Sequence, residues 1–366
     1  MIPVNEPLLN GNEKKYLNEC IDTGWISSEG PFLKKFEEEF AKKVTRSHAV
    51  AVCNGTAALE IAVEALGIGK GDEIIMPAFT IISCASAIIK MGAVPVLVDS
   101  DLQTWNMDVS QIEKKITPKT KAIMAVHIYG LPCDMDTILQ LAKKYKLKVI
   151  EDAAEAHGQT YKGKPCGSFG DVSVFSFYPN KLITTGEGGM LVTDNDALAE
   201  KCRSLRNLCF IAGKRFVHEE LGWNMRMTNL QAALGLAQLE RWDNHVSRKR
   251  AMGKLYTSFL KDVKNISLPV EKTDSAENIY WVFGVLLKNA EAETITKQLA
   301  EKGVGTRPFF YPMHLQPVFK KMGLFKDESY PNAEILYKYG FYLPSGLAIT
   351  EAQIKEVSIV LKETVK

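Results

Sequence analysis

A serine, a lysine and three glycines follow an apolar segment in the middle of the chain, and their spacing suits carbonyl chemistry. Residues 172–177 are predicted to form a buried strand, which leads into the glycine-rich loop 176–189. Lys181 lies in this loop among apolar and small residues. Burial there disfavours the ammonium form and leaves an amine that can attack a carbonyl carbon. An exposed loop lysine is the alternative interpretation, because most lysines lie on the surface.

Two other segments offer groups that a carbonyl-reactive cofactor needs. Gly55 and Thr56 begin a predicted helix, whose N–H groups and positive dipole end suit a phosphate. The alternative is that 54–56 is only a helix-capping turn. Asp152 ends an apolar strand and would place a carboxylate at the mouth of a sheet, where it needs a cation. Its alternative role is the N-cap of a following helix.

These groups together match the needs of pyridoxal 5′-phosphate (PLP). Lys181 would form a Schiff base with the PLP aldehyde, and Asp152 would keep the pyridine nitrogen protonated, so that the ring accepts electrons. The phosphate would lie against Gly55, Thr56 and the Ser176 hydroxyl. No single motif is decisive, but their joint occurrence in this order favours PLP.

The elements that must position these residues alternate between strands and helices. Between 48 and 193 the strands are apolar on both faces, which is typical of a mostly parallel α/β sheet with helices on both sides. Ligands of such sheets bind beyond the carboxyl ends of the strands. Strands are expected at 49–53, 72–76, 94–98, 121–127, 148–150, 172–177, 190–193 and 280–287. Helices are expected at 10–23, 31–44, 56–65, 80–90, 109–115, 135–145, 226–242, 245–262, 291–302 and 351–364.

The pattern changes character near residue 245, where a long helix precedes a more mixed segment. We therefore expect a large α/β domain over 1–245, with an N-terminal helical segment, and a smaller α+β domain over 246–366. A length of 366 residues is sufficient for two such domains.

Composition excludes several classes of protein. A net charge of +2 and the lack of a basic run argue against nucleic acid as a partner. The seven cysteines are scattered without C-x-x-C or Cys/His spacing, which predicts reduced thiols and no metal site. No secretory leader and no apolar window of membrane-spanning length is predicted, so we expect a cytoplasmic protein without a membrane partner.

Five motifs, in order, resemble the DegT/DnrJ-type nucleotide-sugar aminotransferases, and the resemblance extends over practically the whole chain. The motifs are NGTAAL at 54–59, EDAAEAHG at 151–158, SFYPNK at 176–181, GEGG at 186–189 and NMRMT at 224–228. The resemblance implies the type I PLP-dependent aminotransferase fold, with Lys181 as the cofactor-bearing lysine and proton shuttle. It implies that Glu155 faces the ring hydroxyl. It also implies a homodimer in which Asn224 reaches the cofactor phosphate of the neighbouring subunit.

Within this family the chain is most similar to the GDP-perosamine synthases, for example in TGWISS at 23–28 and RPFFYPMH at 307–314. That resemblance implies amination of C4, rather than C3, of GDP-4-keto-6-deoxymannose, with L-glutamate as the donor. The same reaction on a dTDP- or UDP-linked gluco-configured sugar is the alternative. Residues expected to contact the substrate are Trp25, Arg226, Tyr311 and His314, although Arg226 could also be a solvent-facing helix residue.

Two features depart from the family pattern. Ile81 stands where many members stack an aromatic ring on the cofactor, which removes a contribution of about 0.5–1.5 kcal/mol. The segment 209–215 also differs from the GDP-perosamine synthases.

Three other functions compete with the aminotransferase. A dehydratase on this fold would carry histidine in place of Lys181, and a nicotinamide dehydrogenase would need a G-x-G-x-x-G motif that 54–58 lacks. A non-catalytic regulator on the same fold is the alternative from another class.

Overall fold

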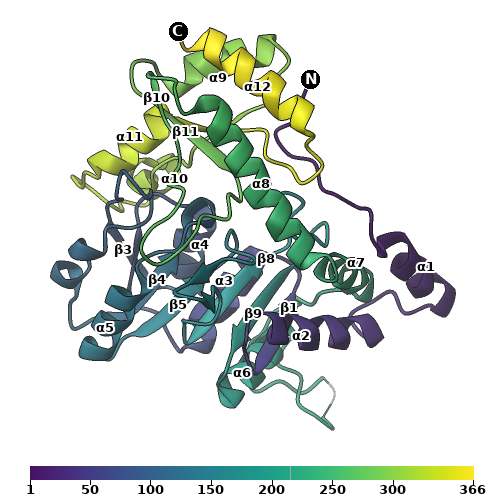
Figure 1. Ribbon diagram of the computed structural model, residues 1–366. Coiled ribbons are helices and arrows are strands. Elements are labelled where there is room, and N and C mark those ends of the chain that lie inside the picture. Colours follow the sequence, from purple (N-terminus) through teal and green to yellow (C-terminus); the bar gives the residue numbers. More distant parts are fainter. Residues whose placement is uncertain (215) are drawn as a thin grey trace.

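A sheet of seven strands forms the core of the lower part of the molecule as it is drawn in Figure 1. The computed structural model describes residues 1–214 and 216–366, so Arg215, the last residue of the divergent segment 209–215, lies outside the described residues. The strand order is β1-β9-β8-β5-β4-β2-β3, and β9 is antiparallel to both of its neighbours while the other pairs are parallel. The expected mostly parallel sheet is confirmed. The strands are β1 (His48–Val52), β2 (Glu73–Pro77), β3 (Val94–Val98), β4 (Thr120–Val126), β5 (Lys148–Asp152), β8 (Val172–Ser176) and β9 (Gly189–Thr193).

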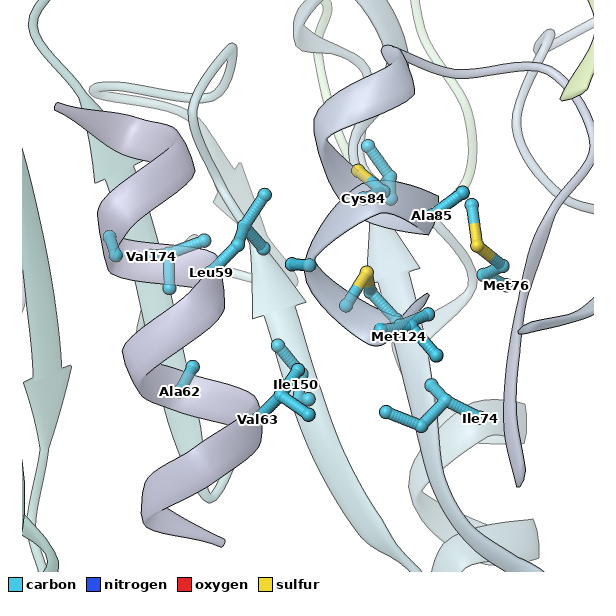
Figure 2. Close-up of a cluster of buried hydrophobic side chains, with 14 of the residues drawn as sticks. Leu59, Ala62, Val63, Ile74, Met76, Cys84, Ala85, Met124, Ile150 and Val174 are labelled. Carbon is cyan, nitrogen blue, oxygen red and sulfur yellow. The ribbon is translucent and has the colours of Figure 1, made fainter. Parts of the chain in front are cut away.

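Helices α3 (Gly55–Ala65) and α4 (Ile82–Lys90) cover one face of this sheet. Figure 2 shows side chains of these helices and of the strands meeting in one apolar layer. Leu59 of α3, Met124 of β4 and Val174 of β8 are all buried in this layer. Because side chains alternate along a strand, the other half of the apolar strand residues point to the opposite face, where they need a second layer of helices.

That second layer consists of α2 (Pro31–Lys43), α5 (Met135–Tyr145) and α7 (Asn229–Leu239). The ring of Phe40 in α2 contacts Phe175 of β8 at 4.9 Å between centroids, in an edge-to-face arrangement. Such edge-to-face pairs are favoured by the charge distribution of aromatic rings. Helices on both faces therefore bury β8, and this packing fixes the position of the strand's carboxyl end.

A smaller antiparallel sheet lies beyond α8 (Trp242–Leu260), the long helix that runs from the large sheet toward the upper part of Figure 1. Its strands, in spatial order, are β10 (Ile266–Ser267), β11 (Phe283–Leu287), β13 (Gly340–Leu343) and β12 (Arg307–Pro308). Helices α9 (Ala292–Glu301), α11 (Pro331–Tyr339) and α12 (Glu351–Thr364) accompany this sheet. The expected domain boundary between 245 and 246 falls within α8, and the division into two domains stays a prediction.

Several expected elements differ from those observed. Residues 109–115 form two 3-10 turns, η1 (Val109–Gln111) and η2 (Glu113–Lys115), in place of one helix. The helix expected at 226–242 begins later, because the Thr228 side chain caps the N-terminus of α7 in a capping box with Gln231. Helices α1 (Glu13–Thr23) and α6 (Asp196–Arg206) complete this part of the chain, and α6 is missing from the sequence prediction. Within the described residues, none of the helices has the length and apolarity needed to cross a bilayer.

The buried side chain of Asn229 connects α7 to the start of α2. Its Oδ1 accepts hydrogen bonds from the N–H groups of Phe32 (3.0 Å) and Leu33 (3.2 Å), and its Nδ2 donates to the carbonyl oxygen of Trp25 (2.7 Å). Helix α2 has no side-chain cap of its own, since its N-cap residue is Gly30. Asn229 therefore satisfies N–H groups at a helix start from a distant part of the sequence.

We predict that Asn229→Ala lowers the free energy of unfolding by about 2–3 kcal/mol, because buried N–H and carbonyl groups lose their partner. Urea unfolding followed by circular dichroism measures the change. The control is Asn289→Ala, at an exposed asparagine, which should change stability by less than about 0.5 kcal/mol. Equal effects of the two substitutions would contradict the assigned role.

Candidate active site

A cavity of about 960 Å³ lies at the carboxyl ends of the central strands β4, β5 and β8. Its volume suits a small molecule with a cofactor, and its position is the one expected for ligands of a parallel sheet. The wall also includes the start of α3 and the segment 307–311 from the smaller sheet. The expected site residues that line it are Gly55, Thr56, Asp152, Glu155, Ser176, Lys181 and Tyr311.

Hydroxyl groups gather at the N-terminus of α3. Asn54 caps the helix by accepting a hydrogen bond from the N–H of Ala57, as the alternative interpretation of this turn predicts. Gly55 and Thr56 nevertheless line the cavity. A Cβ atom on Gly55 would lie 2.8 Å from the Cβ of Ser176, so only glycine lets the first turn of α3 come this close to the end of β8. The Oγ1 of Thr56 lies 2.9 Å from the Oγ of Ser83. Three hydroxyls beside a helix N-terminus form a cradle for a phosphate group.

Lys181 is largely buried, with 10% of its side chain exposed, so the surface alternative is excluded. Its Nζ lies 3.6 Å from the Oε1 of Glu155 and 3.8 Å from the ring centroid of Trp281. Burial lowers the pKa of the Lys181 ammonium, while the carboxylates of Glu155 and Asp152 oppose this shift. A lysine in these surroundings supplies a neutral amine more readily than an exposed lysine.

Asp152 places a buried carboxylate on the cavity wall. Its Oδ1 accepts a hydrogen bond from the N–H of Ala154 (3.0 Å), and its Oδ2 accepts one from the Cys84 thiol (3.3 Å). Burial raises the pKa of Asp152, and these hydrogen bonds lower it only in part. No helix begins at 153–159, so the N-cap alternative is wrong. Within the described chain no cation lies within 4.0 Å of this carboxylate, which leaves a place for a cationic ring nitrogen.

Glu155 lines the same cavity and lies beside Lys181. Its Oε2 accepts a hydrogen bond from the N–H of Tyr129 (2.8 Å), a residue held at a positive φ of 53° in a buried turn. Burial raises the pKa of Glu155 to about 7, against the opposing effect of the Lys181 ammonium. Glu155 can therefore hold or release a proton close to neutral pH.

The other acid at the end of β5, Glu151, points away from the cavity. Its carboxylate accepts hydrogen bonds from the N–H of Gly167 (2.5 Å), the hydroxyl of Ser173 (2.8 Å) and the ring Nε2 of His127 (3.0 Å). Burial alone would raise its pKa, but these donors hold the pKa of Glu151 at about 2. Of the two acids that end this strand, only Asp152 is available to a ligand, because neighbouring side chains in a strand point to opposite faces.

Four expected site residues do not line this cavity: Trp25, Asn224, Arg226 and His314. Trp25 is half exposed, and Arg226 donates from Nε to the Oδ1 of Asn224 (2.9 Å) at the surface. His314 is buried, and its Nε2 lies 2.9 Å from the Oε1 of Glu334. None of these four lines the cavity formed by this chain, and their roles stay predictions. Ile81, which replaces the expected aromatic residue, does line the cavity and is 42% exposed.

Among the wall residues that the sequence did not predict are Ser83, Trp281 and Arg307. Trp281 lies within the strand predicted at 280–287, and Arg307 begins the motif at 307–314. Trp281 has no local neighbour that indicates a ligand, whereas Arg307 stands four residues before Tyr311, which was expected to contact the substrate. Only the packing of the smaller sheet against the cavity brings them there.

The donor set fits PLP. A cradle that a Cβ on Gly55 would fill suits the phosphate, the buried carboxylate of Asp152 suits a protonated ring nitrogen, and the desolvated amine of Lys181 suits the aldehyde. These three groups line one cavity large enough to hold the cofactor and leave room for a substrate.

Comparison with known proteins defines the class. Residues 7–362 match the DegT/DnrJ/EryC1/StrS aminotransferase family, and the chain belongs to it. The PLP form of Spr1654 from Streptococcus pneumoniae, a candidate sugar aminotransferase, superimposes with a TM-score of 0.94 at 27% identity, over 100% of this chain and 98% of that chain. DesV from S. venezuelae, in complex with a ketimine intermediate, gives a TM-score of 0.90 at 34% identity, over 97% and 94%. The predicted type I PLP-dependent aminotransferase is confirmed.

Individual relatives narrow the comparison further. The GDP-perosamine synthase of Escherichia coli O157:H7 is 46% identical over 354 residues, which cover 96% of this chain and 95% of the relative. The GDP-perosamine synthase of Vibrio cholerae is 41% identical, over 99% of this chain and 98% of the relative. That of Caulobacter vibrioides is 44% identical, with the same coverage of both chains.

The raised pKa of Glu155 predicts a pH-dependent contribution to stability. Between its ordinary value of 4.5 and about 7, the folded apoprotein holds a proton that the unfolded chain releases, so this contribution falls as the pH rises. The stability of the wild type relative to Glu155→Gln should decrease by about 3 kcal/mol from pH 4.5 to pH 7. Urea unfolding at a series of pH values measures this difference. A difference that stays constant with pH would contradict the shift.

Proposed function

We propose that this aminotransferase moves the amino group of L-glutamate to C4 of GDP-4-keto-6-deoxymannose and so forms GDP-perosamine. The observation that carries the proposal is the buried Lys181 amine beside two carboxylates, in a cavity with a phosphate cradle. The choice of sugar is supported by three GDP-perosamine synthases that are 41–46% identical over nearly their full length. The same reaction on a dTDP- or UDP-linked 4-keto-6-deoxy sugar is the alternative.

The residues divide the work of the reaction among them. Gly55, Thr56 and Ser176 would hold the PLP phosphate, and Asp152 would hold the ring nitrogen. When bound, PLP supplies an aldehyde that condenses with amines and a ring that withdraws electrons from the neighbouring carbon. Lys181 Nζ takes the proton from the α-carbon of glutamate and later delivers a proton to C4 of the sugar. Its lowered pKa increases the fraction of neutral amine available for the first of these transfers.

Substrate binding needs cations, because glutamate carries two carboxylates and the sugar carries a diphosphate. Arg307, in β12, lines the cavity and bears a guanidinium that can form paired hydrogen bonds with such groups. Lys90 also lines the cavity, but it pairs with Glu60 at 2.6 Å. We assign Arg307 to an anionic group of the substrates and Tyr311 to the sugar pocket.

The active unit in this proposal is a homodimer. Asn224 does not line the cavity of its own chain, which supports a contact between this residue and the cofactor phosphate of a second copy. Exposed apolar side chains, among them Ile21, Trp25 and Ile26, support an interface on the side of α1. All seven cysteines carry free thiols, which supports a cytoplasmic setting.

A substrate panel tests the function. Purified enzyme with PLP and L-glutamate is incubated with GDP-, dTDP- and UDP-linked 4-keto-6-deoxy sugars, and the aminated products are measured by mass spectrometry. We expect kcat/KM for the GDP sugar to exceed the others by at least about tenfold. Lys181→Ala, as the control, should form no product and should lose the visible absorption of bound PLP. Preference for a dTDP or UDP sugar would replace the proposed substrate by its alternative.

Subunit mixing tests the shared site. Lys181→Ala and Asn224→Ala each impair the enzyme, and co-refolded mixtures contain hybrids with one intact site if Asn224 acts across the interface. At limiting PLP, an equal mixture should regain about one quarter of wild-type activity, because half of the dimers are hybrids and each has one working site. The control mixture of Lys181→Ala with the double variant should regain none. An equal mixture without any gain would place Asn224 in its own subunit's site or in none.

A further inference from the structure

Trp281 makes two contacts with the loop that carries Lys181. The Nζ of Lys181 lies 3.8 Å from the ring centroid, and the indole Nε1–H donates to the carbonyl oxygen of Asn180 at 2.7 Å. Trp281 is only 4% exposed and lines the cavity. One contact is with the amine itself, and the other is with the main chain directly before it.

The position of Trp281 is itself fixed from α8. Lys249, in the middle of this helix and 1% exposed, donates from Nζ to the carbonyl oxygen of Trp281 at 2.7 Å and to that of Ser345. One turn further along, a Cβ on Gly253 would lie 2.2 Å from the ring of Tyr280, so the absence of a side chain there admits that ring. Two neighbouring residues at the start of the smaller sheet are thus held against one face of α8.

The released amine of Lys181 needs a defined place in the reaction. If Lys181 acts as proposed above, its Nζ is bonded to the cofactor in one state and free in the next, when it must stay near the reacting carbon. A free ammonium at the observed position lies over the face of an indole ring and 3.6 Å from Glu155. A cation over a tryptophan face is stabilised by the negative charge density of the ring, more so when water is excluded.

We propose that Trp281 is a positioning residue for Lys181: its ring face holds the released ammonium, and its N–H fixes the loop that carries it. This inference rests on the proposed role of Lys181 and not on the identity of the sugar. Lys249 acts through Trp281, since it holds the main chain of that residue and does not line the wall beside Lys181.

The test is the pKa of Lys181 in the apoprotein, measured by the pH dependence of its acetylation with peptide mass spectrometry. The charged and titratable groups that act on this amine are Glu155, Asp152, Arg307 and His157, and all are kept. Trp281→Leu retains an apolar side chain without a ring, so the ammonium loses stabilisation and its pKa should fall by about 0.5 to 1 unit. Trp281→Phe retains an aromatic face that attracts the ammonium less strongly, so the pKa of Lys181 in this variant should fall by less than half as much.

Trp223→Leu is the matched control, because Trp223 does not line the cavity and its loss should leave the pKa of Lys181 unchanged. An unchanged pKa in folded Trp281→Leu protein overturns the proposal. If that variant does not fold, Trp281→Phe decides: a pKa below the wild-type value supports the proposal, and an equal value overturns it. Because the measurement uses neither PLP nor sugar, its outcome is independent of the substrate panel.

Discussion

A buried amine between an aromatic ring and two buried carboxylates is the arrangement on which the rest of this structure depends. Each of these charges would be costly alone in the interior, and together they offset part of that cost. Burial lowers the pKa of Lys181 and raises the pKa of Glu155, and the charge of each group opposes the effect of burial on the other. The effect of burial is the larger one, so the pKa values of both groups lie closer to neutral pH than those of exposed residues of the same type. A group that transfers protons near neutral pH needs such a pKa.

The fold supplies this arrangement by ending parallel strands at one edge. β5 delivers Asp152 to that edge, β8 delivers Ser176, and α3 begins there with Gly55. Packing on both faces of the sheet fixes the height of each strand end, because a strand sandwiched between two helical layers cannot shift without opening an apolar contact. The close approach of Gly55 to Ser176 shows how little space remains between these elements. The packing that buries the sheet therefore also fixes the relative positions of the site residues.

The sequence predicts the part of the site that comes from strand ends. Gly55, Asp152, Ser176 and Lys181 each follow a recognisable apolar strand or begin a helix, and the topology of a parallel sheet then brings them together. Trp281 was missed because its contact with Lys181 joins segments one hundred residues apart, through packing of the smaller sheet that no local pattern encodes. The helix expected at 109–115 was wrong because apolar spacing over so short a segment does not distinguish one helical turn from two 3-10 turns.

Helix α8 contacts the segment that carries Trp281 from outside the cavity. On one face it carries Lys249 and Gly253, one turn apart, and both touch the main chain or ring of the residues that precede β11. A Cβ at position 253 would lie 2.2 Å from the ring of Tyr280, the residue directly before Trp281, so a larger side chain there has to displace that ring. A substitution at this helix position therefore perturbs the residue next to Trp281 without changing a residue that lines the cavity.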